Sequence, residues 1–380
     1  MDCQKQLFQL PEGTHYLNCA YMSPLLKSVE EAGIRGMRLK RDPTSIKPVD
    51  FFTGAVGVRD KFARMVHGNP AQVAIMPSVS YGMSSVMRNI PCRKGQHALT
   101  ISEEFPSCYY TAQRWCSDHH AELRVVARND DIPQKGMEWN MRILEAINKD
   151  TAFIVMASVH WMNGTRFDLE QIGARCREVG AKLIVDGSQS VGALPMDVEA
   201  CRIDALICAA YKWLMGPYST ALSYIHPDFN EGVPLEESWM TRPNSERFDR
   251  LTNYEKGYKP GAIRFDVGQS SSFIHLPMLD AALKQILDWG VANIQEYGRT
   301  LGTPLIAHIL QKGAILDEEA YRAHHLLGLQ LPGNIRAEVL MNAFQSRKVF
   351  VSLRGNNIRI SLHVFNDDAD IRELIGALEA

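Results

Sequence analysis

The sequence predicts an α/β fold: a large domain with a mostly parallel seven-stranded sheet flanked by helices, and a smaller C-terminal α+β domain. Two observations support this. In the first two thirds of the chain, short apolar segments alternate with longer amphipathic stretches, as in strand–helix–strand units. In addition, 380 residues exceed the size of one ordinary hydrophobic core, so a second unit is expected.

Seven segments have the length and apolar content of buried strands. They are Val73–Met76 and residues 98–101, 123–126, 153–157, 183–185, 205–208 and 221–225. The clearest helix between them covers residues 168–179, because Asp168 is a suitable N-cap, Gln171 completes a capping box, and Gly180 follows the last turn.

The pattern changes after about residue 255. Residues 276–310 read as one long helix and residues 337–347 as another. Strand-like segments at 349–353 and 358–364 flank a hairpin turn, Arg354-Gly355-Asn356-Asn357, and a closing helix follows Asp367. We place the junction near Tyr258-Lys259-Pro260-Gly261, which gives a large domain of residues 15–258 and a small domain of residues 1–14 and 259–380.

Composition excludes several classes of function. The 41 basic and 43 acidic residues nearly cancel and form no block of like charge, so neither nucleic acid nor an anionic membrane is an expected partner. No apolar run approaches the roughly 20 residues of a membrane span, and the N-terminus lacks a signal-peptide pattern. The eight cysteines are scattered without a CxxC pair, which predicts reduced thiols in a cytoplasmic protein and no metal site.

Two ionisable residues mark the ends of predicted strands. Asp186 ends the apolar run 183–185, and Lys212 follows the run 205–208. The carboxyl ends of parallel strands meet at one edge of a sheet, where α/β proteins place their ligands. A salt bridge is one interpretation of the pair. The other is a pyridoxal phosphate (PLP) site, in which a desolvated lysine forms a Schiff base and a carboxylate keeps the pyridine nitrogen protonated.

A phosphate site is available at another strand end. Ser78 and Ser80 follow the strand Val73–Met76 and open a helical stretch, where backbone N–H groups and the helix dipole favour an anion. A plain serine N-cap is the alternative interpretation. No Walker lysine is present and no GxGxxG motif follows a strand, so nucleotide binding has little support.

Aromatic and polar residues follow two further strands. Phe105 could stack on a flat cofactor, and His160, Trp161 and Asn163 follow residues 153–157. Taken singly, such residues more often pack or cap than bind a ligand. Their position at successive strand ends together with Asp186 and Lys212 makes chance a poor explanation.

These segments resemble the class V aminotransferase family of fold-type I PLP enzymes, which includes cysteine desulfurases, kynureninases and isopenicillin-N-epimerase-like proteins. The resemblance covers nearly the whole chain. It rests on the segments 16–24, 105–107, 164–169, 186–192, 211–217, 264–268 and 358–363. The most specific are Asp186-Gly187-Ser188-Gln189-Ser190-Val191-Gly192 and Tyr211-Lys212-Trp213-Leu214-Met215-Gly216-Pro217.

The resemblance implies a role for each matching residue. Lys212 would form the Schiff base with PLP, Asp186 would pair with the pyridinium, and Gln189 would approach the phenolic oxygen. Phe105 would stack on the ring. The phosphate would be held by Ser78, the Val79 amide and Tyr211, with Ser80 in addition.

The resemblance also implies a substrate side and a partner subunit. Arg359 would bind the substrate carboxylate, which suits a bidentate guanidinium. Arg264 is a second candidate, with an interdomain ion pair as the alternative. Family members usually complete their site across a homodimer interface, and Ser271 lies in the region that reaches the neighbour's phosphate. Further residues expected at the substrate are Asn18, His160 and Trp161.

The chain departs from the cysteine desulfurases. Those enzymes carry a nucleophilic cysteine in the C-terminal third, whereas this chain has none after Cys208 and reads His324-His325-Leu326-Leu327-Gly328 there. Sulfur transfer through a persulfide is therefore not expected. Tyr211 replaces the desulfurase histidine, and Trp161 replaces an asparagine frequent in the other branches, which predicts a differently shaped pocket.

The implied reaction proceeds through an external aldimine and a carbanion at Cα of a small amino-acid substrate. We expect a transaminase or a C–S or β-elimination lyase, with an amino-acid epimerase or racemase as the alternative. A non-catalytic PLP-binding regulator is a further alternative. The shared motifs serve all these reactions and do not choose among them.

Overall fold

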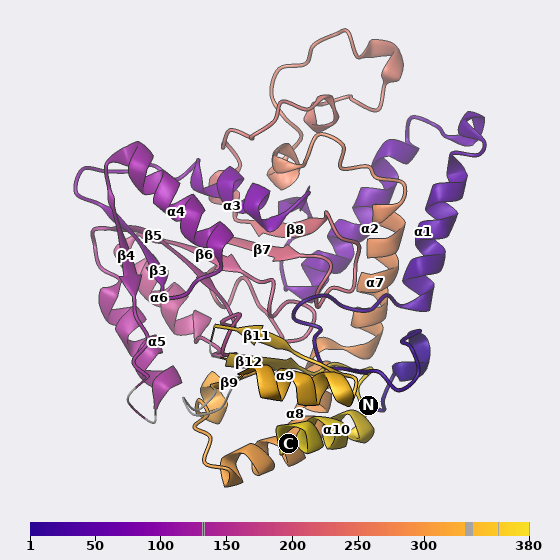
Figure 1. Cartoon of the computed structure of the whole chain (residues 1–380). Coiled ribbons are helices and arrows are strands. Elements are labelled where there is room, and N and C mark those ends of the chain that lie inside the picture. The colour runs from indigo at the N-terminus through magenta and orange to yellow at the C-terminus, as the bar shows by residue number, and fades with distance from the viewer. Residues whose placement is uncertain (131, 133, 331–336, 356, 380) are drawn as a thin grey trace.

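The computed structural model describes residues 1–130, 132, 134–330, 337–355 and 357–379. A seven-stranded sheet forms the centre of the large domain, in the order β2-β8-β7-β6-β5-β3-β4 (Figure 1). Six strands are parallel to one another, and β8 is antiparallel to both of its neighbours. All seven predicted strands are confirmed. Their bounds are β2 Val73–Met76, β3 His97–Ile101, β4 Glu122–Val126, β5 Thr151–Ala157, β6 Lys182–Asp186, β7 Ala205–Ala209 and β8 Ala221–Ile225.

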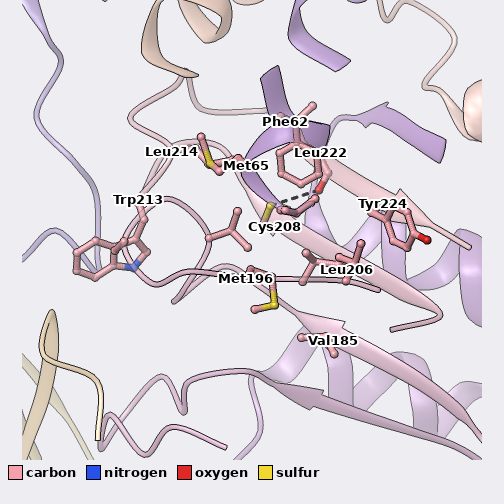
Figure 2. Packing of buried hydrophobic residues seen from close by; sticks show 14 of the residues in the cluster. Phe62, Met65, Val185, Met196, Leu206, Cys208, Trp213, Leu214, Leu222 and Tyr224 are labelled. Carbon is pink, nitrogen blue, oxygen red and sulfur yellow. Dashed lines mark hydrogen bonds between the residues drawn. The ribbon is translucent and has the colours of Figure 1, made fainter. Parts of the chain in front are cut away.

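Helices cover both faces of this sheet. Alternate strand residues face α3 and α4 on one side and α2, α5, α6 and α7 on the other, because successive side chains of a strand point to opposite faces. The helices are α1 Lys27–Leu39, α2 Asp50–Met65, α3 Val79–Met87, α4 Pro106–His119, α5 Lys135–Ala146, α6 Leu169–Val179 and α7 His275–Trp289. Figure 2 shows Phe62 and Met65 of α2 packed near Leu222 and Cys208 of the sheet.

The predicted ends of α6 are confirmed. The Asp168 carboxylate accepts a hydrogen bond from the Gln171 backbone N–H at 3.0 Å, and Gly180 adopts a left-handed conformation with φ 77°. One detail differs from the predicted capping box. The Gln171 side chain donates to the Asp168 carboxylate, and the Asp168 N–H instead donates to the side chain of Asn140.

The C-terminal part contains a three-stranded antiparallel sheet, β11-β12-β9, with helices packed against it (Figure 1). The predicted hairpin is confirmed as β11 and β12, although its residue Asn356 lies outside the described part of the chain. The N-terminal β1 (His15–Tyr16) pairs with β10. The other elements are α8 Val291–Gln311, β9 Leu326–Gln330, α9 Ala337–Ser346, β10 Val349–Phe350, β11 Ser352–Arg354, β12 Asn357–Ser361 and α10 Asp368–Leu378.

Two predictions in this part were wrong, and one strand was missed. The expected helix over residues 276–310 is two helices, because Gly290, with φ 79° and ψ 122°, ends α7 and begins α8. The expected strand 349–353 is divided between β10, which pairs with the N-terminal segment, and β11, which pairs with β12. The third strand of the small sheet, β9, was not predicted.

The division into residues 15–258 and the remainder stays a prediction. Helix α7, which follows the proposed junction, packs against α1 and α2 of the N-terminal half (Figure 1).

Among the described residues, no helix has both the length and the apolar character needed to cross a bilayer. Short 3-10 helices occur at Lys5–Leu7, Pro43–Ser45, Pro70–Gln72, Pro227–Phe229, Trp239–Thr241, Phe248–Arg250, Gly261–Phe265 and Glu319–Tyr321.

Candidate active site

A cavity of about 290 Å³ lies at the carboxyl ends of the parallel strands. The loops after β2, β3, β5, β6 and β7 all contribute to its wall, because these ends meet at one edge of the sheet. Nine of the residues predicted from the sequence line it: Ser78, Val79, Ser80, Phe105, Trp161, Asp186, Gln189, Tyr211 and Lys212.

Lys212 is a buried amine without a counter-ion. Its side chain is 8% exposed, and it forms no ion pair with any described residue. Its Nζ lies 5.5 Å from the centre of the Phe105 ring. Burial lowers the pKa of Lys212 to about 8; the negative charge of Asp186 opposes this shift and the positive charge of Arg359 adds to it. A neutral, nucleophilic amine is therefore accessible near neutral pH.

Asp186 ends β6 and is also buried. One carboxylate oxygen accepts a hydrogen bond from the Ser188 N–H at 2.8 Å, and the other accepts one from the Cys108 thiol at 3.5 Å. No ion pair joins Asp186 to Lys212 or to another cation of the described chain. The salt bridge considered as an alternative is thus not formed, and both ionisable side chains face the cavity without an ion-pair partner among the described residues.

The first turn of α3 forms one end of the cavity. Ser78 is the N-cap, and its hydroxyl accepts a hydrogen bond from the Tyr81 N–H at 3.1 Å. The hydroxyl of Ser80 donates to that of Ser107 at 2.8 Å. Ser78 therefore does cap the helix, and the same turn directs its remaining N–H groups and its dipole toward the cavity wall, which suits an anion.

Gln189 and Trp161 are held by hydrogen bonds beside the cavity. The Gln189 side-chain nitrogen donates to the carbonyl of Ala20 at 3.1 Å. The Trp161 indole donates to the carbonyl of Glu103 at 2.7 Å and meets the Phe105 ring edge-on at 5.5 Å. These contacts fix the orientation of both side chains before any ligand arrives.

Arg359 contacts the backbone of the loop that carries Trp161. Arg359 is 2% exposed, and its Nη1 donates to the Trp161 carbonyl at 3.0 Å. The other two nitrogens, Nε and Nη2, are buried without a partner among the described residues. Burial lowers the pKa of Arg359 to about 10, and Arg354 adds to this effect. Buried donors without acceptors are costly unless a ligand supplies acceptors.

Five predicted residues do not line the cavity: Arg359, described above, and His160, Asn18, Arg264 and Ser271. His160 is fully buried, packs edge-on against Trp139 at 5.2 Å, and its pKa is lowered to about 4 by burial. Asn18 accepts a hydrogen bond from Ser352 at 2.7 Å. The structure thus uses both polar side chains within the protein, in the packing and capping roles that such residues often have.

Arg264 and Ser271 also lie away from this cavity. The Arg264 guanidinium donates to the carbonyl of Gly232 at 3.2 Å and lies 4.9 Å from the Tyr258 ring. Its ion pair with Glu231 is long, at 3.9 Å. Ser271 contacts the sulfur of Met240 at 3.7 Å.

Sequence reasoning missed six polar lining residues, which are Glu104, Ser107, Ser188, Tyr218, Ser219 and Thr220. Three of these immediately precede β8. Because β8 is antiparallel, its beginning lies at the edge where the parallel strands end, so residues before it reach the same cavity. A search limited to residues after strands could not find them. The signal available was the run Tyr218-Ser219-Thr220 directly before a predicted strand.

A buried lysine and a strand-end carboxylate in one cavity, on a sheet of this order, define a fold-type I PLP enzyme. The family model described as aminotransferase class V matches residues 49–374, and the chain belongs to that family.

Relatives within the family differ in their reactions. The chain is 25% identical over 324 residues to the uncharacterized aminotransferase YcbU of Bacillus subtilis (strain 168), covering 85% of this chain and 82% of YcbU. It is 23% identical over 383 residues to isopenicillin N epimerase of Streptomyces clavuligerus, covering 96% and 94%. A solved structure of the cystine C-S lyase C-DES with its product cysteine persulfide has a similar fold, with a TM-score of 0.86, 19% identity and 97% of each chain covered.

Proposed function

We propose that this chain binds pyridoxal 5'-phosphate covalently through Lys212 and acts on a small or medium-sized amino acid as a transaminase or a C–S or β-elimination lyase. One observation carries the proposal: Lys212 and Asp186 are both buried in one cavity, and neither has a counter-ion among the described residues. Such an arrangement is unfavourable by itself, and a ligand that uses both groups explains it.

The lining residues fit the cofactor. Asp186, held by the Ser188 N–H, would pair with the pyridine nitrogen. The start of α3 with Ser78 supplies the phosphate end, and the Phe105 ring supplies a flat apolar face. The cofactor, when bound, supplies an electron sink that stabilises negative charge at the substrate Cα.

The protein's own groups then have distinct tasks. Lys212, with its lowered pKa, accepts the proton from the substrate Cα and returns it. The unpaired Nε and Nη2 of Arg359 bind the substrate carboxylate. Trp161 connects the substrate-carboxylate site with the cofactor site. Its carbonyl accepts a hydrogen bond from Arg359, and its ring packs against Phe105 and excludes water there.

An epimerase is the second candidate, supported by the near-complete coverage of the isopenicillin N epimerase relative. A desulfurase that carries sulfur on a cysteine of its C-terminal third has no support, since no cysteine follows Cys208. A lyase of this chain would instead release the sulfur-bearing fragment directly.

The cofactor assignment is tested by spectroscopy. Protein purified with pyridoxal 5'-phosphate should show a visible absorption band that Lys212→Ala abolishes. Lys284→Ala, which removes an exposed lysine on α7, is the matched control and should keep the band. Persistence of the band in Lys212→Ala would remove Lys212 from its assigned role.

The reaction is tested by products. A panel of amino acids is incubated with the holoenzyme, with and without an α-keto acid. Dependence on the keto acid indicates transamination, release of ammonia with pyruvate or sulfide indicates β-elimination, and loss of Cα deuterium without net conversion indicates epimerisation. No change with any amino acid would contradict the enzyme proposal.

We also propose that the chain works as a homodimer. The segment between β8 and α7 projects from the body at the top of Figure 1, beside the ends of α1 and α2. Large apolar side chains are exposed on this segment and these helices: Met37, Val56, Trp239, Leu251 and Tyr254. Arg264 and Ser271 lie within this segment, which supports a role toward a neighbouring subunit. Sedimentation analysis tests the dimer, and a monomer at micromolar concentration would overturn it.

A cytoplasmic location is supported by the cysteines. All eight are free thiols, and six of them are buried. Fractionation of the native source tests this location.

A further inference from the structure

The hairpin of β11 and β12 places two arginines on one face. Ser352 is directly opposite Arg359, and Arg354 is directly opposite Asn357. Residues opposite each other in an antiparallel pair share a face, and so do residues two apart along a strand. The side chains of Arg354 and Arg359 therefore project from the same side of the hairpin as diagonal neighbours, roughly 7–8 Å apart at their bases.

This face is the one turned toward the cavity. On it, Ser352 donates to Asn18, the Ser361 hydroxyl accepts from the Ala20 N–H, and Arg359 donates to the carbonyl of Trp161. The tip of the hairpin lies against the same loop, since a Cβ added at Gly355 would meet the Met162 side chain at 3.0 Å. Arg354 thus extends from the edge of the hairpin beside the loop that carries Trp161.

Neither arginine is neutralised by a carboxylate in the part of the chain that the structure describes. No carboxylate among the described residues forms an ion pair with Arg354 or Arg359, and the hydrogen bond of Arg354 goes to the neighbouring carbonyl of Leu353. The buried Arg59, by contrast, forms an ion pair with Asp266. Arg354 also adds to the lowering of the pKa of both Arg359 and Lys212, after burial, which reflects its closeness to the site.

We propose that Arg354 binds a second anionic group of the substrate, so that the preferred substrate is an α-amino acid whose side chain carries a carboxylate or a sulfur oxyanion. This inference rests on the proposed function, in which the buried Arg359 takes the α-carboxylate. Arg354 is half-buried and lies closer to the tip of the hairpin than Arg359, on the same face. It therefore contacts the side chain of a substrate whose α-carboxylate is bound by Arg359. Two cations at this spacing select a dianionic ligand over its neutral isostere.

The first experiment compares matched ligand pairs. The holoenzyme is titrated with aspartate against asparagine and with glutamate against glutamine, following the change in the cofactor's absorption. We expect the acidic member of a pair to bind about 10-fold more tightly, the effect of one partly exposed charge-assisted hydrogen bond. Arg354→Gln should bring this ratio close to one without weakening the amide, and Arg354→Lys should keep part of it.

Two controls make the result specific. Arg372→Gln removes an exposed arginine elsewhere in the C-terminal part and should leave the ratio unchanged. Arg359→Ala should weaken the binding of both amino acids in each pair by the same factor, since both carry the α-carboxylate. A wild-type ratio near one, or a ratio that survives Arg354→Gln, would overturn the inference.

A second experiment separates this inference from the proposed function. Succinate and butyrate are titrated by calorimetry into protein without added cofactor. A preference for succinate that Arg354→Gln abolishes supports the anion site even if no cofactor binds to Lys212. An absorption band with no succinate preference in either form would sustain the proposed function and reject the role of Arg354.

Discussion

The indole of Trp213 donates a hydrogen bond to the side-chain oxygen of Gln189 at 2.9 Å, within the buried region between the sheet and the C-terminal part. An indole N–H can only donate, so this bond fixes which end of the amide is oxygen. The amide nitrogen of Gln189 then points the other way and donates to the carbonyl of Ala20. The Gln189 oxygen is thus used within the protein, and only the second N–H of its amide nitrogen remains to donate to a ligand in the cavity.

We predict that Trp213→Phe weakens cofactor binding. Phenylalanine keeps most of the packing but lacks the donor, so the Gln189 amide is free to turn. Loss of one buried hydrogen bond corresponds to about 1 kcal/mol, or roughly a fivefold rise in the dissociation constant measured by absorption titration. Trp289→Phe is the control, because Trp289 is also buried but contacts the Phe8 ring. Equal effects of the two changes would contradict the role of the hydrogen bond.

The lowered pKa of Lys212 predicts a pH dependence of covalent capture. Only the neutral amine attacks the cofactor, so the rate of band formation should rise about tenfold per pH unit below pH 8 and level off above it. Stopped-flow mixing of cofactor-free protein with pyridoxal 5'-phosphate measures this rate. Because the charge of Arg359 contributes to the lowering, Arg359→Met should move the midpoint to higher pH. A wild-type midpoint near 10.5 would show that the amine is not desolvated.

Much of the large domain could be predicted because its signals are local. Each strand of the central sheet is a short apolar run bounded by turns, and Asp168 and Gly180 mark both ends of α6. The C-terminal part was less predictable. Gly290 breaks the long helix by adopting φ 79°, a conformation that glycine permits but does not require, so the apolar pattern continues through the break.

The site was predictable where a residue ends a parallel strand, as Asp186 does, or follows one closely, as Lys212 does. It was not predictable where position depends on topology or rotamer. Tyr218, Ser219 and Thr220 reach the cavity because β8 runs antiparallel. His160 follows β5 but packs its ring against Trp139, a contact between distant parts of the chain that no local pattern reveals.

The break at Gly290 gives a prediction about stability. An alanine there would be strained at φ 79° and ψ 122°, and its Cβ would approach the Asn293 side chain to 3.0 Å. We expect Gly290→Ala to lower the free energy of unfolding by about 3 kcal/mol. Gly180→Ala, at a left-handed position with open space around it, should lower it by only about 1 kcal/mol. Denaturant unfolding measures both, and similar values would contradict the strain at Gly290.

Glu104 is a second buried carboxyl at the floor of the cavity. Its two oxygens accept hydrogen bonds from the N–H groups of Phe105 and Ala157, at 2.6 and 2.7 Å. Ala157 is the register neighbour of Asp186 in the sheet, so the two carboxyl groups arrive side by side. Burial, with a further contribution from the charge of Asp186, raises the pKa of Glu104 to about 8.

This shift predicts how the stability of the cofactor-free protein changes with pH. The unfolded chain releases the Glu104 proton near pH 4.5, whereas the folded chain keeps it until about pH 8. Between these values the folded state binds more protons, so the free energy of unfolding falls as the pH rises, by at most about 1.4 kcal/mol per unit. Glu104→Gln does not titrate and removes this contribution. Urea unfolding from pH 5 to 8 should therefore show that the free energy of unfolding falls more steeply for the wild type than for Glu104→Gln. Only the slopes are compared, so a constant difference in stability between the two proteins does not matter. Parallel profiles would mean that Glu104 is already ionised in the folded protein, and that Asp186 shares the floor of the cavity with a second negative charge.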